Sequence, residues 1–152
     1  MPVTGFPAHL DISVGRTERS IPFYAAFLEA LGYRRWRVPM AEWQGPSPTR
    51  ATWGLESAAG ERFEVEVRPA RAESRDRAYD HYEPGPHHLA FHAESRAAVD
   101  RVHRAVADAG GVILDPPTDY GNQPGYSEGY YAVFFADPDG FKLEVVHLPA
   151  KR

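Results

Sequence analysis

One order of strand and helix signals occurs twice in this 152-residue sequence. Each copy begins with an alternating segment that carries a histidine, HLDISV (9–14) in the first copy and HHLAFHA (87–93) in the second. Each copy ends with a β-rich segment that carries a glutamate, RFEVEV (62–67) and KLEVVH (142–147). A repeat of this kind predicts that the chain folds as two copies of one structural unit.

Between these segments, each copy contains signals for one helix and two further strands. In the first copy, residues 17–31 carry an apolar stripe, with Thr17 as the expected N-cap and Gly32 as the stop. In the second copy, Ser95 is expected to cap a helix that ends at Gly110 and Gly111. Strands are expected near 9–14, 34–38, 50–56 and 62–67, and near 87–93, 112–115, 130–136 and 142–147. The predicted order is β-α-β-β-β, twice.

We therefore expect an α+β fold made of two tandem βαβββ modules, within a single domain that covers residues 1–152. Module one spans about 7–68 and module two about 87–148. The residues between them, 69–86, are rich in Arg, Glu, Asp, Pro and Gly and show no period, which is typical of a linker.

The last strand of the second module carries a charged residue among apolar ones. The sequence Asp-Pro-Asp-Gly at 137–140 is typical of a type I turn, and the strand that follows holds Glu144 between Leu143 and Val145. Burying an unpaired charge is costly, so this carboxylate either faces water or has a partner such as a metal ion.

The spacing of the repeat favours a metal ion. His88 follows His9 by 79 residues and Glu144 follows Glu64 by 80, and all four lie opposite the apolar residues of their strands. Because the chain has no cysteine, a metal would have to bind through imidazole and carboxylate, which suit Zn, Ni, Mn or Fe(II). The alternative is that these side chains line the wet face of an antiparallel sheet, above all Glu64, since Glu66 shares its face.

Other residues of the predicted metal face, namely Asp11, His92 and Glu66, are expected to support the ligands or line a pocket. We expect His87, His103 and His147 to be structural. They lie off that face by alternation or on the second helix.

An aromatic loop precedes the seventh predicted strand. Residues 115–131 contain Tyr120, Tyr126, Tyr130 and Tyr131, and the corresponding loop of the first module contains Trp43, with Trp36 and Trp53 in the strands beside it. Such loops often bind ligands or close over them, and a tyrosine hydroxyl can donate to a developing oxyanion. Packing over the open end of the sheet is the alternative. Tyr131, at the start of a strand, is the candidate catalytic tyrosine.

Composition excludes several other classes of protein. The net charge is −4 and the sequence pI is about 6.0, so there is no basic face for nucleic acid. Residues 1–8 lack the features of a signal peptide, and no stretch has the length and hydropathy of a membrane span. We therefore expect a cytoplasmic protein with a small-molecule ligand and no nucleic-acid or membrane partner.

The segments HLDISVGRTERSIPFY, HHLAFHAESRAAVD and YYAVFFADPDGFKLEVVH resemble the superfamily of glyoxalase I, bleomycin-resistance proteins and extradiol dioxygenases, over nearly the whole chain. The resemblance implies a curved, mostly antiparallel sheet around a metal cavity, with helices on the outer face. It implies one divalent ion bound by His9, Glu64, His88 and Glu144, with Glu144 or Glu64 moving a proton. It also implies a homodimer, since members often complete the cavity across two chains.

Three function classes follow from the resemblance. The first is a metal-dependent lyase or isomerase similar to glyoxalase I, which acts on a small carbonyl or vicinal-oxygen compound. The second is a non-enzymatic protein of the bleomycin-resistance type that sequesters a drug, which the Trp and Tyr content suits. The third is an Fe(II) extradiol dioxygenase, which needs only two histidines and one glutamate.

Overall fold

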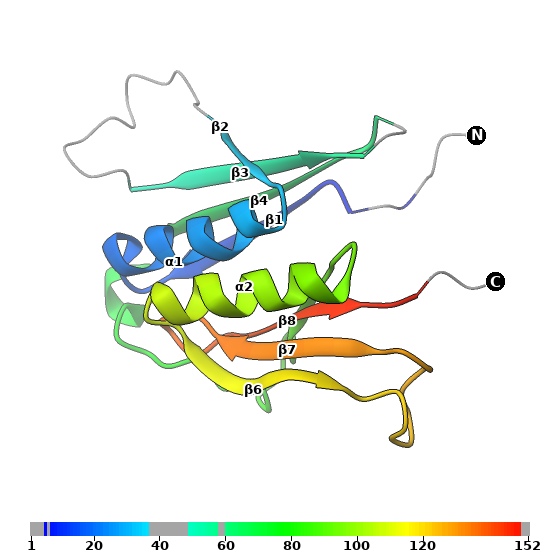
Figure 1. Cartoon of the computed structure of the whole chain (residues 1–152). Coiled ribbons are helices and arrows are strands. Elements are labelled where there is room, and N and C mark those ends of the chain that lie inside the picture. The colour runs from blue at the N-terminus through cyan, green and yellow to red at the C-terminus, as the bar shows by residue number, and fades with distance from the viewer. Residues whose placement is uncertain (1–4, 6, 37–48, 58–59, 150–152) are drawn as a thin grey trace. The chain divides into compact units, whose positions relative to one another are not determined.

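The computed structural model describes residues 5, 7–36, 49–57 and 60–149 of the chain. The chain divides into two compact units, Met1–Asp76 and Arg77–Arg152 (Figure 1). Each described unit contains the elements β-α-β-β-β in the predicted order, so the α+β fold of two βαβββ modules is confirmed. The predictions for 37–38 and for Trp43 lie outside the described residues.

The first unit is a four-stranded sheet with one α-helix. Its strands lie in the order β1-β4-β3-β2, with β1 parallel to β4 and the other neighbours antiparallel. The helix α1 packs against β3 and β4, where it buries Phe27 and Leu28 together with Trp53, Val65 and Val67. The elements are β1 (His9–Val14), α1 (Thr17–Ala30), β2 (Arg34–Trp36), β3 (Ala51–Glu56), β4 (Arg62–Pro69) and a short 3-10 helix, η2 (Ala72–Ser74). Arg16, rather than Thr17, occupies the N-cap position.

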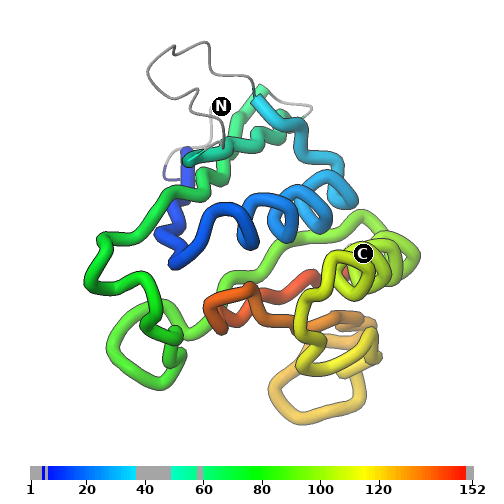
Figure 2. Tube along the Cα trace, turned by 90° about the vertical axis from the view of Figure 1, so that its left-hand side faces the viewer, coloured from blue at the N-terminus to red at the C-terminus, as the bar shows by residue number. Residues whose placement is uncertain are grey.

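The second unit repeats this topology in the order β5-β8-β7-β6, with β5 parallel to β8. Its elements are β5 (Leu89–His92), α2 (Arg96–Asp108), β6 (Val112–Asp119), β7 (Tyr131–Ala136) and β8 (Lys142–His147). The predicted cap of α2 is confirmed, because the Ser95 hydroxyl accepts a hydrogen bond from the Ala98 amide at 3.2 Å. The helix covers the sheet face that contains Val133, Phe135 and Val145. The loop between β6 and β7 is yellow to orange in Figure 2.

The turn before β8 is held by one buried aspartate. The Asp137 side chain accepts hydrogen bonds from the amides of Asp139, at 2.9 Å, and Phe141, at 2.8 Å. Gly140 has φ of 91°, a left-handed conformation that side chains disfavour. The chain reversal predicted at 137–140 is therefore confirmed, and it sends β8 back beside β7 with Glu144 in mid-strand.

Two element boundaries differ from the sequence prediction. The strand expected at 112–115 continues to Asp119 and contains irregularities in its pairing with β7. The strand expected at 87–93 begins only at Leu89, so His87 and His88 precede it. The division of the chain into modules and a linker within one domain stays a prediction.

No helix among the described residues is long and apolar enough to cross a membrane.

Candidate functional site

The buried carboxylate of Glu144 is the centre of the site in the second unit. The residue is 1% exposed, and both of its carboxylate oxygens have partners. Oε1 accepts a hydrogen bond from the Tyr130 hydroxyl, and Oε2 lies 3.1 Å from Nε2 of His88. The partners explain how a charged group is accommodated among apolar neighbours, as burial of an unpaired carboxylate would be costly.

His88 links Glu144 to a second histidine. Its Nδ1 lies 2.7 Å from Nδ1 of His87, and its ring contacts Phe134 edge-on with centroids 6.2 Å apart. Side chains therefore form a continuous chain of hydrogen bonds from His87 through His88 and Glu144 to Tyr130. Desolvation lowers the pKa of His87 most. The positive charges of His88, His81 and Lys142 lower it further.

The segment before β5 is anchored to the turn before β8. The Tyr79 amide donates to the Asp139 carbonyl at 2.8 Å, and the Tyr79 ring packs edge-on against Phe141 at 4.9 Å. The Tyr79 hydroxyl donates to the Pro86 carbonyl. The end of the predicted linker is thus part of the second unit, and it positions His87 beside the sheet.

Aromatic side chains from the loop between β6 and β7 pack beside Glu144. Tyr130 lies 4.8 Å from Tyr126 and 6.3 Å from Tyr120, and these rings pack toward Phe134 on the same sheet face as Glu144. Burial, and then the Glu144 carboxylate, raise the pKa of Tyr130 above its usual value. The hydroxyl is therefore protonated at neutral pH and acts as a hydrogen-bond donor.

Tyr131, the tyrosine selected from the sequence, has a different environment. Its hydroxyl donates to Asp100 of α2 at 2.9 Å, and Arg96 lies over its ring at 4.9 Å. Tyr131 therefore contacts the helix, whereas the preceding residue, Tyr130, contacts Glu144. The sequence signal for Tyr130 was its place in the same tyrosine-rich loop, directly before β7.

In the first unit, His9 and Glu64 are direct register partners on β1 and β4. Residues paired in this way project from the same face of a sheet, as the sequence predicts for these two.

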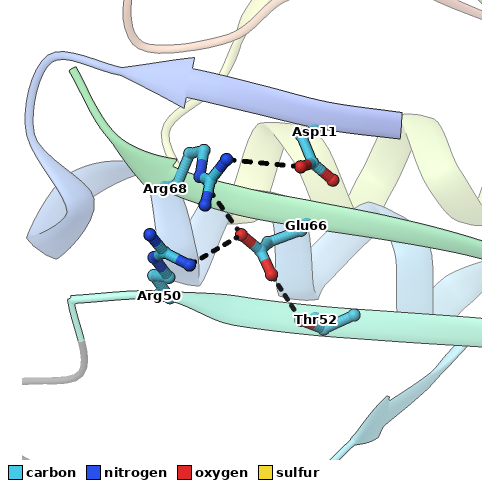
Figure 3. A network of polar contacts seen from close by, with 5 residues as sticks. All are labelled: Asp11, Arg50, Thr52, Glu66 and Arg68. Carbon is cyan, nitrogen blue, oxygen red and sulfur yellow. Dashed lines mark hydrogen bonds and ion pairs between the residues drawn. The ribbon is translucent and has the colours of Figure 1, made fainter. Parts of the chain in front are cut away.

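A network of arginines and carboxylates lies two residues further along these strands (Figure 3). Arg68 contacts both Asp11, at 3.4 Å, and Glu66, at 3.3 Å, and Arg50 lies 3.5 Å from the same Glu66 oxygen. The second Glu66 oxygen accepts from the Thr52 hydroxyl at 3.4 Å. Glu66 Oε1 is buried and has these two ion pairs but no hydrogen bond of normal geometry.

The parallel pairing of the first strand with the last relates the two units differently from the sequence repeat. In the first unit, the residue opposite Glu66 is the second after His9. In the second unit, the residue opposite Glu144 is the second after His88. When the two histidines are taken as equivalent, Glu66 is therefore the structural counterpart of Glu144.

When the two histidines are taken as equivalent, the counterpart of Glu64 in the second unit is Lys142. Glu64 lies opposite His9 itself, and continuing the β5–β8 register by one residue places Lys142 opposite His88.

The pairing of the last two strands gives the other result: Gly54 lies opposite Glu64 and Phe134 lies opposite Glu144, and each residue of the second pair follows its counterpart in the first by 80 residues. In that comparison Glu64 is the counterpart of Glu144, as in the sequence repeat.

The donor set of the second unit fits a divalent ion. An imidazole nitrogen and a carboxylate oxygen 3.1 Å apart, with the carboxylate buried, are ligand types that suit Zn, Ni, Mn or Fe(II). Among residues 5, 7–36, 49–57 and 60–149, no three His, Asp or Glu side chains are close enough together to hold an ion. The four-ligand set of His9, Glu64, His88 and Glu144 takes two residues from each unit, and its assembly stays a prediction.

The sequence is similar to one protein superfamily and to one curated bacterial protein. The sequence model of the Glyoxalase/Bleomycin resistance protein/Dioxygenase superfamily matches residues 7–145. The uncharacterised protein YqjT of Bacillus subtilis is 29% identical over 140 residues, which cover 91% of this chain and 95% of YqjT.

Solved structures show the same fold. A protein of Bacillus halodurans described as a candidate glyoxalase matches with a TM-score of 0.70 and 25% identity, over 95% of this chain and 97% of that one. A glyoxalase/dioxygenase from Nostoc punctiforme matches with a TM-score of 0.65 and 20% identity, over 99% and 97% of the two chains. A glyoxalase/bleomycin resistance protein from Albidiferax ferrireducens matches with a TM-score of 0.62 and 24% identity, over 93% and 98%.

Proposed function

Because the chain belongs to the Glyoxalase/Bleomycin resistance protein/Dioxygenase superfamily, we propose that it is a divalent-metal-dependent enzyme similar to glyoxalase I. It would act as a lyase or isomerase on a small carbonyl or vicinal-oxygen compound. The observation that supports this best is the buried Glu144 carboxylate with Tyr130 and His88 on its two oxygens.

Glu144 and His88 are the proposed ligands from the second module. His9 is the proposed ligand from the first, together with Glu64, as the sequence repeat and the β3–β4 pairing suggest, or Glu66, as the β1–β4 pairing suggests. A bound ion would supply Lewis-acid polarisation of the substrate oxygens.

The side chains of the second unit suit the transfer of one proton between adjacent carbons. Glu144 Oε2 would take the proton from the carbon next to the substrate carbonyl and return it to the neighbouring carbon. Tyr130 would keep its proton, because its pKa is raised, and would hold the carboxylate by donating to Oε1. The isomerisation needs no further reactant: one proton moves from one carbon to the next, and the substrate's hydroxyl proton moves from one oxygen to the other.

The experiment combines metal content with two assays. Protein reconstituted with Ni, Zn, Mn or Fe(II) is tested for isomerisation of a hemithioacetal and for oxygen uptake with catechols. Isomerisation that collapses in Glu144→Gln supports the proposal, because the variant keeps the shape of the side chain but removes the base. Fe(II)-dependent oxygen uptake would instead support an extradiol-type dioxygenase.

A second candidate, sequestration of an aromatic drug, is favoured by one observation. Tyr120 and Tyr126 stack with centroids 5.1 Å apart and planes at 26°, and Tyr126 is 38% exposed, so the loop offers an aromatic surface. Tight binding of an aromatic antibiotic, with both assays silent and with Glu144→Gln binding unchanged, would establish this alternative.

We also propose a homodimer in solution, because among the described residues the two sheets end at strands β1 and β2 and at strands β5 and β6, and an edge strand can pair with another chain. Light scattering at micromolar concentration tests this, and a monomer would contradict it.

A further inference from the structure

His87 occupies a position that alternation along the chain did not assign to the site. Its Nδ1 lies 2.7 Å from Nδ1 of His88, a normal hydrogen-bond distance between two ring nitrogens. The opposite nitrogen of His88, Nε2, is the one that faces Glu144. Both nitrogens of the His88 ring are therefore engaged, one by a carboxylate and one by a second imidazole.

The proton positions of this chain follow from the hydrogen-bonding capacity of each group. An ionised carboxylate only accepts, so the contact with Glu144 requires the proton of a neutral His88 to be on Nε2. His88 Nδ1 is then an acceptor, and the donor is His87 Nδ1–H. For His88 Nε2 to serve instead as a ligand, its proton has to be on Nδ1, and His87 Nδ1 must accept.

A histidine at position 87 satisfies both arrangements. A neutral imidazole carries one donor and one acceptor, and it exchanges their places by moving its proton from one nitrogen to the other. Neither a lysine, which only donates, nor an ionised carboxylate, which only accepts, could pair with His88 Nδ1 in both states.

The ring of His87 is exposed and contacts neighbouring rings of the same segment. It packs edge-on against His81, at 4.9 Å, and Tyr82, at 5.7 Å. The segment that carries it is attached to the turn before β8 through Tyr79. The His87 ring also lies edge-on to the His88 ring, with centroids 5.0 Å apart.

We propose that His87 is the positioning residue of His88. Through its Nδ1 it holds the His88 ring with Nε2 directed at Glu144, and it allows that nitrogen to change from hydrogen-bond donor to metal ligand. The second part of this inference rests on the proposed function, whereas the first concerns the metal-free protein and does not.

The first experiment uses NMR of the full-length, metal-free protein labelled with ¹⁵N. The variants are His87→Phe, which keeps a ring but removes the nitrogens, and His87→Asn, which keeps a polar group near the place of Nδ1. His87→Phe is expected to shift the His88 Nδ1 resonance and broaden the His88 ring signals, and His87→Asn to restore them in part. His103→Phe on α2 is the matched control and should leave them unchanged. An unchanged His88 Nδ1 resonance in His87→Phe would overturn the inference.

The second experiment measures Zn²⁺ affinity by calorimetry on the same proteins after removal of bound metal. Loss of the partner of a ligating histidine typically costs roughly 10- to 100-fold in metal affinity, and that is the loss expected for His87→Phe. His87→Asn should recover part of it, and His103→Phe should bind as the wild type does. Equal affinity in His87→Phe and wild type would overturn the positioning role.

The two experiments separate the inference from the function on which it rests. A wild-type protein that binds none of Zn²⁺, Ni²⁺ and Mn²⁺ refutes the metal-dependent function and the part of the inference that concerns a ligand. The NMR result still decides whether His87 orients His88.

Discussion

Replacing Tyr130 by phenylalanine removes one hydroxyl and leaves the ring contacts in place. In the wild type this hydroxyl donates to Oε1 of Glu144, a carboxylate that is 1% exposed. The ring packs against Tyr126 at 4.8 Å and Tyr120 at 6.3 Å, and phenylalanine can keep both contacts. The substitution therefore tests the hydrogen bond more than the packing.

The expected loss follows from the type of hydrogen bond. A hydrogen bond to a charged group contributes about 1.5–3 kcal/mol, and a buried carboxylate oxygen that loses its donor also bears the cost of desolvation. Tyr130→Phe should therefore lower the free energy of unfolding by about 1.5–3 kcal/mol, or roughly 10- to 150-fold in the unfolding equilibrium.

Urea unfolding followed by fluorescence measures this change as a lower midpoint with an unchanged slope. Tyr126→Phe is the matched control: it removes the hydroxyl of a partly exposed ring in the same loop, and its effect should stay within about 0.5 kcal/mol. A double-mutant cycle with Glu144→Gln should show that the two losses are not additive. If Tyr130→Phe is as stable as Tyr126→Phe, the Tyr130–Glu144 hydrogen bond does not support the site as argued.

The remaining predictions concern pH, the anchoring of the loop and the ligands of the first unit. Burial raises the pKa of Tyr33 from 10.0 to about 12, so the folded protein keeps a proton that the unfolded chain loses. Stability should therefore fall by about 1.4 kcal/mol per unit between pH 10 and about 12, and Tyr33→Phe should lack this share of the slope. Tyr79→Phe removes the hydrogen bond to the Pro86 carbonyl, which contributes about 1 kcal/mol. Amide hydrogen exchange in residues 80–88 should therefore become roughly fivefold faster, and exchange in α2 serves as the internal reference. Glu64→Gln should lower Zn²⁺ affinity more than Glu66→Gln, because Arg50 and Arg68 already hold the Glu66 carboxylate, and the opposite order in calorimetry would favour Glu66 as the ligand.

Features that depend on neighbouring residues could be predicted from the sequence. The turn at 137–140 needs only a buried aspartate and a glycine with φ of 91°, and both are present in four consecutive residues. The Ser95 cap likewise lies within four consecutive residues, 95–98. The order of strands followed from composition and alternation, because each strand buries one face.

Alternation fails at strand ends, and two residues of the second unit show this. His87 was assigned off the metal face by parity with the strand at 87–93, but β5 begins at Leu89. Tyr131 was preferred because it starts a strand, yet its hydroxyl contacts α2, and Tyr130, just outside β7, contacts Glu144. Residues that precede a strand have no fixed alternation, so their contacts depend on the path of the loop, which composition does not encode.

The sequence pattern could not show whether Glu64 or Glu66 is the ligand, and the reason is different. Side chains two residues apart on a strand project from the same face, so a register change of two residues keeps the same apolar side chains of β4 on the face toward α1. The apolar pattern that fixes the face therefore cannot distinguish the two glutamates. They differ in their neighbours: Glu64 lies opposite His9, and Glu66 lies between Arg50 and Arg68. Those two guanidinium groups hold the Glu66 carboxylate by charge, so an ion that used Glu66 would have to compete with both arginines, whereas one that used Glu64 would not.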